Sequence, residues 1–177
     1  MHDLSVRPAD ILEKVIQTYG TMLFRLSLIM LGNADDAEDV VQDTMVKYWK
    51  KSPEFKNADH EKAWLLAVAA NRCRDILRSR QRHPVVSMEN IKEFLELSEN
   101  SGGTGIPVFT DGISETGILD ALMTLPEKFR LVLYLYYVEE YSINDIAGMI
   151  KRTPSAVKMR LKKGRQLLEE KYRKEYM

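Results

Sequence analysis

The sequence of 177 residues has few of the side chains that build covalent or metal-held structure. Cys73 is the single cysteine, which excludes an internal disulfide and a cysteine-based zinc site. The three histidines lack the spacing of metal ligands, and no phosphate loop, nucleophile–base grouping or metalloprotease motif is present. We therefore expect no cofactor, no bound metal and no enzymatic activity.

Long apolar runs are missing too. The runs at residues 22–31 and 64–70 are too short to span a bilayer, and Arg25 interrupts the first. The N-terminus lacks the basic start and apolar stretch of a signal peptide. The chain is expected to be soluble and cytoplasmic.

A net charge of either sign is absent, because 26 basic residues balance 26 acidic ones. The distribution along the chain is uneven, however. Residues 1–84 carry 13 basic and 12 acidic side chains, residues 85–119 carry one and six, and residues 120–177 carry 12 and eight. Within the two outer segments the cations concentrate at residues 62–83 and 151–174. Two basic elements separated by an acidic stretch indicate nucleic acid as a partner.

Apolar residues recur with a helical period through the first 84 residues, and no stretch there alternates convincingly like a strand. Three helices are expected, at about residues 9–30, 35–51 and 61–82, with a loop at 52–59. The second begins with acids and ends with lysines, in agreement with the helix dipole. The apolar faces of these helices include Ile11, Ile16, Trp49 and Trp64.

Residues 85–117 change character, with five of the nine glycines and several acids, which is typical of a flexible acidic linker. Within it, residues 87–98 fit one short amphipathic helix. Four helices follow at about 118–125, 126–138, 142–150 and 154–172. Pro126 and Pro154 suit first helical positions, and Ser142 with Asp145 is close to a capping box. The sequence therefore predicts an all-α chain: two small helical bundles, residues 1–84 and 118–177, joined by the linker 85–117.

The last two helices follow a helix-turn-helix pattern. Its expected packing positions are Ile146, Ala147, Ile150, Val157 and Leu161. The remaining faces of the final helix are basic, which suits the major groove of DNA, where side chains reach phosphates and base edges together. A basic, solvated helix in a generic bundle is the alternative. The turn length, the small alanine and the one-sided cations together favour DNA binding.

The third helix carries a second cationic face, and arginine with amide side chains can contact phosphates and unstacked bases. Phe55, His60 and Trp64 are candidate stacking faces, although Trp64 also fits the core. An ordinary amphipathic helix with an exposed arginine face is the alternative here. The acids at residues 35–43 lack a calcium loop, so they indicate a solvated helix start or an acidic docking surface.

Three segments in order resemble a bacterial RNA polymerase sigma factor of the extracytoplasmic-function (ECF) branch. They are residues 36–49 (DAEDVVQDTMVKYW), 63–78 (AWLLAVAANRCRDILR) and 121–130 (ALMTLPEKFR), the last leading into 141–165. The resemblance covers about residues 19–82 and 118–169. It implies promoter-specific transcription initiation. The first bundle would be sigma region 2, which binds core polymerase and the −10 element, and the second would be sigma region 4, which binds the −35 element.

The resemblance also implies roles for single residues. The −35 duplex would be read by Ser155, Lys158, Met159, Arg160, Lys162 and Lys163. The opened −10 strand would be held by His60, Lys62, Asn71, Arg72, Asp75, Arg78 and Arg80. The clamp helices of the largest polymerase subunit would bind Asp39, Gln42, Asp43 and Lys47. Further implied partners are the flap of the second-largest subunit, promoter DNA and an anti-sigma factor, often a membrane protein.

Lys151 departs from the family pattern, because the turn of the helix-turn-helix usually has glycine there. A lysine with positive φ costs about 1 kcal/mol. Either the turn is adjusted, or the cost is borne for an added phosphate contact.

Two other functional classes remain open from the residues alone. A conventional transcription regulator with an N-terminal helical sensor would bind duplex DNA without polymerase, as a dimer. An adaptor that binds only proteins would show no dependence on DNA.

Overall fold

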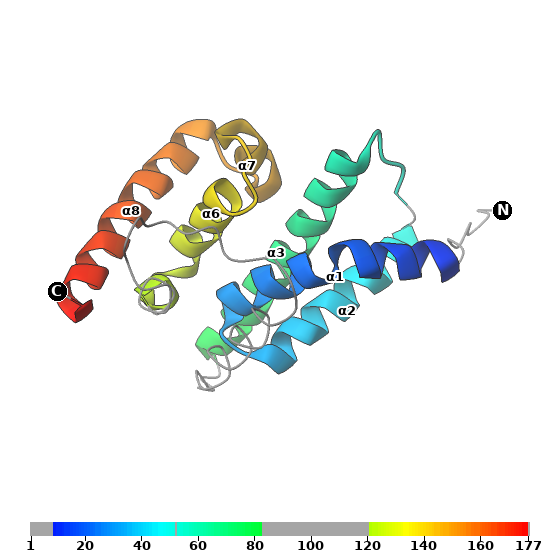
Figure 1. Ribbon diagram of the computed structural model, residues 1–177, viewed down its shortest axis with the longest axis horizontal. Coiled ribbons are helices and arrows are strands. Elements are labelled where there is room, and N and C mark those ends of the chain that lie inside the picture. The colour runs from blue at the N-terminus through cyan, green and yellow to red at the C-terminus, as the bar shows by residue number, and fades with distance from the viewer. Residues whose placement is uncertain (1–8, 52, 83–120, 177) are drawn as a thin grey trace. The chain divides into compact units, whose positions relative to one another are not determined.

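The computed structural model describes residues 9–51, 53–82 and 121–176, and all regular structure in these ranges is helical (Figure 1). The chain divides into two compact units, Met1–Val86 and Ser87–Met177. The predicted all-α fold with two small bundles is confirmed. The linker 85–117 and its short amphipathic helix lie outside the described residues, so the boundaries at 84 and 118 remain predictions.

The first unit consists of α1 (Ala9–Leu31), α2 (Ala34–Lys51) and α3 (Ala58–Arg82), each of which packs against the other two (Figure 1). Gly32 ends α1 in the left-handed conformation, with φ 70°, and donates its N–H to the Leu28 carbonyl at 2.8 Å. Glycine adopts this φ without steric cost, so a two-residue connection is sufficient between α1 and α2.

Asparagine side chains start the next two helices. Asn33 Oδ1 accepts the Asp36 N–H at 2.9 Å, and Asn57 Oδ1 accepts the His60 N–H at 2.8 Å. These bonds satisfy backbone donors that the first turn of a helix leaves free. Because of the second cap, α3 begins at Ala58, three residues before the predicted start, and the preceding loop is correspondingly shorter.

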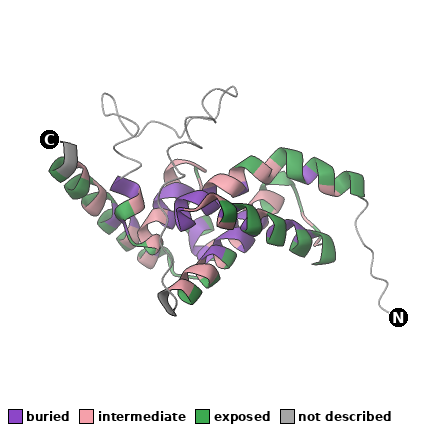
Figure 2. Ribbon diagram, turned by 90° about the horizontal axis from the view of Figure 1, so that it is seen from below, coloured by how far each residue is buried: buried purple, intermediate pink, exposed green. Residues whose placement is uncertain are grey.

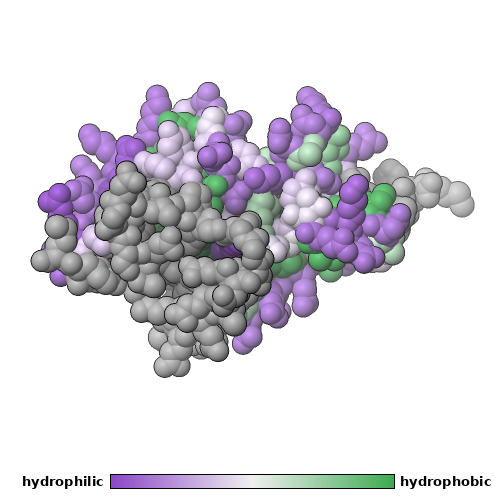
Figure 3. All heavy atoms as spheres, in the orientation of Figure 1, coloured by the Kyte–Doolittle hydropathy of each residue, from purple (hydrophilic) through white to green (hydrophobic). Residues whose placement is uncertain are grey.

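The buried core of the first unit lies where the three helices meet (Figure 2). Residues 26–32 are buried without interruption, whereas most of the first half of α1 is exposed. Ile11, Ile16 and Trp49 lie on the predicted apolar faces, but their side chains are 39%, 44% and 38% exposed, so these faces are only partly buried. Periodicity identifies the apolar side of a helix. It does not show what length of that side is buried by a neighbouring helix. Hydrophobic areas on the visible surface are small among hydrophilic side chains (Figure 3).

The second unit consists of α6 (Glu127–Tyr137), α7 (Ile143–Ile150) and α8 (Pro154–Tyr176), preceded by a helical turn at residues 121–124. α8 packs against both α6 and α7. Pro126 is the N-cap of α6, with ψ 143°, and not its first residue as predicted. Nothing in the described ranges is a helix long and apolar enough to cross a bilayer.

Side-chain caps begin α7 and α8. Ser142 Oγ accepts the Asp145 N–H at 3.2 Å, as predicted, and Thr153 Oγ1 accepts the Ala156 N–H at 3.2 Å. α8 continues four residues beyond the predicted end at residue 172. Its last turns carry the ion pairs of Glu169 with Arg173 at 2.7 Å and Glu170 with Lys174 at 2.8 Å, which support an exposed helix only weakly.

Gly164 marks a close approach of α8 to α6. A Cβ at this position would lie 3.2 Å from Leu133 Cδ1 and 3.4 Å from Phe129 Cβ, whereas a Cβ at Gly148 in α7 would meet nothing within 4 Å. We expect Gly164→Val to lower the free energy of unfolding of the second unit by about 1–3 kcal/mol through overpacking. Gly148→Val, the matched control, should change it by only a few tenths of a kcal/mol, because a Cβ there meets nothing and valine and glycine differ little in helix propensity.

Urea unfolding followed by circular dichroism measures both variants. Equal stability of the two would contradict the close packing of α8 on α6.

Candidate nucleic-acid interface

The helix-turn-helix of the second unit is formed by α7, a three-residue turn and the first half of α8. All five predicted packing residues are at most 5% exposed, which confirms this part of the prediction. They are Ile146, Ala147, Ile150, Val157 and Leu161. Their burial fixes which side of α8 faces the protein and leaves the opposite side to solvent.

The turn keeps its left-handed residue although that residue is lysine. Lys151 has φ 53° and ψ 54°. The Arg152 N–H donates to the Ala147 carbonyl at 2.9 Å, and the Lys151 N–H donates to the Gly148 carbonyl at 3.4 Å. This is the hydrogen-bond pattern of a Schellman motif, which satisfies the last carbonyls of α7. The turn is therefore not adjusted to avoid a positive φ.

Replacing Lys151 by glycine is expected to raise the free energy of unfolding of the second unit by up to about 1 kcal/mol, since glycine adopts this conformation without steric cost. Lys151→Ala serves as the control, because it removes the same exposed side chain but retains the strained Cβ. Urea unfolding measures both. If Lys151→Gly and Lys151→Ala raised the free energy of unfolding equally, the lysine side chain, and not the left-handed backbone, would be the cause of the strain.

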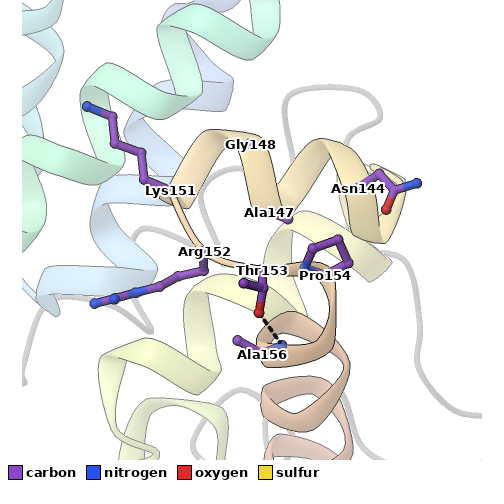
Figure 4. A pocket seen from close by; sticks show the side chains of 8 residues that line it. All are labelled: Asn144, Ala147, Gly148, Lys151, Arg152, Thr153, Pro154 and Ala156. Carbon is purple, nitrogen blue, oxygen red and sulfur yellow. Dashed lines mark hydrogen bonds between the residues drawn. The ribbon is translucent and has the colours of Figure 1, made fainter.

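A shallow hollow lies between α7 and the start of α8 (Figure 4). Lys151 and Arg152 leave the turn on one side of it, and Asn144 lies at the other end. Both basic side chains are exposed. Neither residue is among those predicted to read the −35 duplex, although Lys151 was considered for an added phosphate contact and both residues lie in the turn that precedes α8.

The solvent side of α8 carries most of the residues predicted for the −35 element. Ser155, Lys158, Lys162 and Lys163 are exposed, and Met159 is 68% exposed. These side chains form one row because they lie opposite the buried positions 157, 161 and 164.

Two further residues of α8 define the extent of that row. Arg160 is half-buried and stands at its edge. Gln166 is exposed four residues after Lys162 and seven after Met159, so it continues the row by another turn. This helical spacing was a usable signal for Gln166 in the sequence, but the prediction omitted it.

The predicted −10 residues of α3 are largely engaged with other side chains. Arg72 Nε lies 2.6 Å from Asp43 Oδ2 on α2. Arg78 pairs with Asp75 on its own helix at 3.5 Å, and Asn71 Oδ1 accepts a hydrogen bond from Arg74. The Arg72–Asp43 pair links a residue predicted to bind DNA with one predicted to bind polymerase.

Arg80 has a structural role that the sequence did not reveal. Its guanidinium pairs with Asp36 at the start of α2 and donates to the Leu31 carbonyl at 3.3 Å. Its side chain is 27% exposed. These contacts join the end of α3 to the α1–α2 connection.

An aromatic cluster connects the loop at residues 53–57 to α2 and α3. Phe55 stacks on Tyr48, with ring centroids 5.9 Å apart at 12°, and meets Trp64 and His60 edge to face at 5.8 and 5.5 Å. His60 is exposed, whereas Phe55, Trp64 and the predicted Lys62 are half-buried. The three predicted stacking residues therefore lie together, with Trp64 between the core and the loop.

The outward side of α2 carries the residues predicted to dock on polymerase. Asp39, Gln42, Asp43 and Lys47 are all exposed. Val46, 46% exposed, lies among them, and Trp49 extends the same side. The surface thus combines carboxylates with apolar side chains.

The single cysteine and the arrangement of possible metal ligands can be described for the part of the chain that the structure covers. Cys73 is buried, and desolvation raises the pKa of its thiol to about 12. A thiol with that pKa stays protonated at neutral pH and is a poor nucleophile. No three His, Cys, Asp or Glu side chains of the described ranges are grouped so that they could hold a metal ion.

Comparisons with known proteins agree with the presence of two helical units. Residues 15–83 match the family model for Sigma-70 region 2, and residues 116–168 match the one for Sigma-70, region 4. The chain is 24% identical to the ECF RNA polymerase sigma factor SigW of Bacillus subtilis over 93% of this chain and 90% of that one. It is 30% identical to the ECF RNA polymerase sigma factor SigL of Mycobacterium tuberculosis over 86% and 84%.

A solved structure shares the fold. It is the sigma factor RpoE in complex with the anti-sigma factor NepR from Bartonella quintana. The TM-score is 0.66 at 22% identity, and the match covers 94% of this chain and 98% of that one.

Proposed function

Since the chain belongs to the sigma-70 family, as an RNA polymerase sigma factor of the ECF branch, we propose how its two units divide promoter recognition. α8 reads the −35 duplex in the major groove. α3 and the loop at residues 53–57 hold the opened −10 strand, and the outward side of α2 docks on the clamp helices of the largest polymerase subunit. The second unit contacts the flap of the second-largest subunit.

The observation that carries the proposal is the exposed row on α8. Its cations stand on a helix whose opposite side is buried in a helix-turn-helix. Lysines neutralise phosphates and position the helix, whereas side chains at base edges supply sequence preference. Met159, at 68% exposure, is suited to contact a thymine methyl group, and Gln166 has the amide that pairs with adenine.

Neither unit needs to bind promoter DNA tightly by itself. When polymerase holds both units at once, binding of the second DNA element becomes intramolecular and gains an effective concentration. The ion pairs of three α3 arginines with acids are consistent with this, because they leave the isolated first unit a modest cationic surface.

Sigma factors are initiation factors, and we assign this chain no catalytic activity of its own. Polymerase binding places it in the cytoplasm. An anti-sigma factor is a proposed partner, supported by the fold shared with a sigma factor that was solved in such a complex.

One experiment tests the function directly. The purified chain is added to core polymerase from its source, and run-off transcripts are sought from genomic promoters, including the promoter of its own gene. Promoter-specific transcripts that require the chain are expected. If none appears from any promoter, the sigma function is refuted, and duplex binding without polymerase would then point to a conventional regulator.

A further inference from the structure

One carboxylate joins all three helices of the first unit. Glu61, in the first turn of α3, accepts a hydrogen bond from Tyr48 Oη of α2 at 2.5 Å and one from Tyr19 Oη of α1 at 3.4 Å. The Tyr48 side chain is completely buried. A buried hydroxyl is costly without a partner, so Glu61 determines where Tyr48 can lie.

The Tyr48 ring in turn supports the loop at residues 53–57. Phe55, in the middle of that loop, stacks on Tyr48 at 12°, and Trp64 meets Tyr48 edge to face at 6.1 Å. Phe55 then meets the exposed His60 ring at 86°. A displacement of Tyr48 would therefore move Phe55 and change the surface that the loop presents.

The end of the loop next to α3 is held by a separate set of bonds. Asn57 caps α3, and the Lys56 N–H donates to His60 Nδ1 at 3.3 Å. The loop is thus fixed on the α2 side by Tyr48 and on the α3 side by Asn57 and His60. A loop that is ordered before binding does not lose conformational entropy when its ligand arrives.

The second tyrosine remains a donor at physiological pH. Burial, and then the negative charge of Glu61, raise the pKa of Tyr19. Its hydroxyl therefore keeps its proton and can continue to donate to the carboxylate. Because the contact is 0.9 Å longer than that of Tyr48, it is the weaker of the two.

We propose that Glu61 is a positioning residue for −10 recognition, acting through Tyr48 to hold the loop at residues 53–57 in its binding shape before DNA arrives. The ligand of the prepared loop is an unpaired base of the opened strand, which stacks beside Phe55 and His60. The inference rests on the proposed function of the first unit. It goes beyond that function because it assigns the shape of the loop to residues outside the loop. The two hydrogen bonds of Glu61 join it to Tyr48 and Tyr19, which lie 13 and 42 positions earlier in the sequence.

The test uses the full chain with core polymerase. Tyr48→Phe removes the hydroxyl but keeps the stacked ring. We expect it to reduce the preference for the natural −10 sequence over a base-substituted one by about tenfold, the effect of losing one hydrogen bond to a charged group. Association with core polymerase, and the response to −35 substitutions, should stay unchanged.

Graded variants separate positioning from simple stabilisation. Glu61→Gln keeps an acceptor oxygen and should retain most of the preference, whereas Glu61→Leu should lose it. Tyr19→Phe, which breaks the longer contact, should have the smaller effect. On a promoter opened beforehand by mismatches across the −10 element, the loss caused by Tyr48→Phe should persist, because it concerns base capture and not duplex opening.

Two outcomes would overturn the proposal. One is an unchanged −10 preference in Tyr48→Phe. The other is an equal loss on every promoter that parallels a lower unfolding temperature, which would make the contact purely structural. Failure of the sigma function itself is recognised separately, because the unaltered chain would then give no promoter-specific transcript.

Discussion

Alanine at both Lys158 and Lys162 is expected to lower transcription from a −35-dependent promoter by about a hundredfold, since each lost hydrogen bond to a charged phosphate contributes roughly 1.5–3 kcal/mol and 1.4 kcal/mol is a factor of ten. Both lysines are exposed on the solvent side of α8. The packing residues Val157 and Leu161 remain in place, so the helix-turn-helix should still fold. Run-off transcription at fixed polymerase concentration measures the effect.

Salt dependence distinguishes phosphate contacts from base contacts in the same variant. If both lysines neutralise phosphates, the slope of log affinity against log salt should fall by roughly two. The control is the double variant Lys128→Ala, Lys171→Ala, which removes the same charge from exposed positions of the second unit outside the row on α8. Unchanged transcription in the test variant would show that α8 is misassigned. An equal loss in the control would indicate a general effect of charge.

Charge reversal at Asp39 is expected to weaken association with core polymerase by about ten- to a hundredfold, because a like-charge contact at an interface costs several kcal/mol. The structure favours Asp39 over Asp43 for this test. Asp43 pairs with Arg72, so charge reversal at Asp43 would also disturb α3. The effect on polymerase docking would then be combined with an effect on DNA binding. Asp39 is exposed and has no ion pair within the described ranges.

Competition with a labelled sigma factor for core polymerase measures the affinity of Asp39→Lys. Glu13→Lys provides the matched control, because it makes the same charge change at an exposed position of α1. Full retention of polymerase by Asp39→Lys in this assay would refute the docking role of α2. The defect should also shrink at high salt, since exposed charges are screened there.

Much of the surface proposed to read the −35 element could be predicted because it depends on local spacing. A helical repeat places Val157 and Leu161 on one side of α8 and Lys158 and Lys162 on the other, whatever the rest of the chain does. The surface proposed to hold the −10 strand was harder to predict. Arg80 looked like one more DNA-binding cation, and only the packing of α3 against α2 shows that Asp36 and the Leu31 carbonyl engage it.

The sequence by itself determined the helices, the Ser142 cap of α7 and the membership of the sigma-70 family, because these depend on residues close together in the chain or on ordered motifs. The tertiary structure alone decided which cations pair with acids, which part of α1 is buried, and that Tyr48 contacts both Glu61 and Phe55. Such contacts join residues on different helices. Helical period cannot predict them, because they depend on how far each helix is covered and on how its neighbours are rotated.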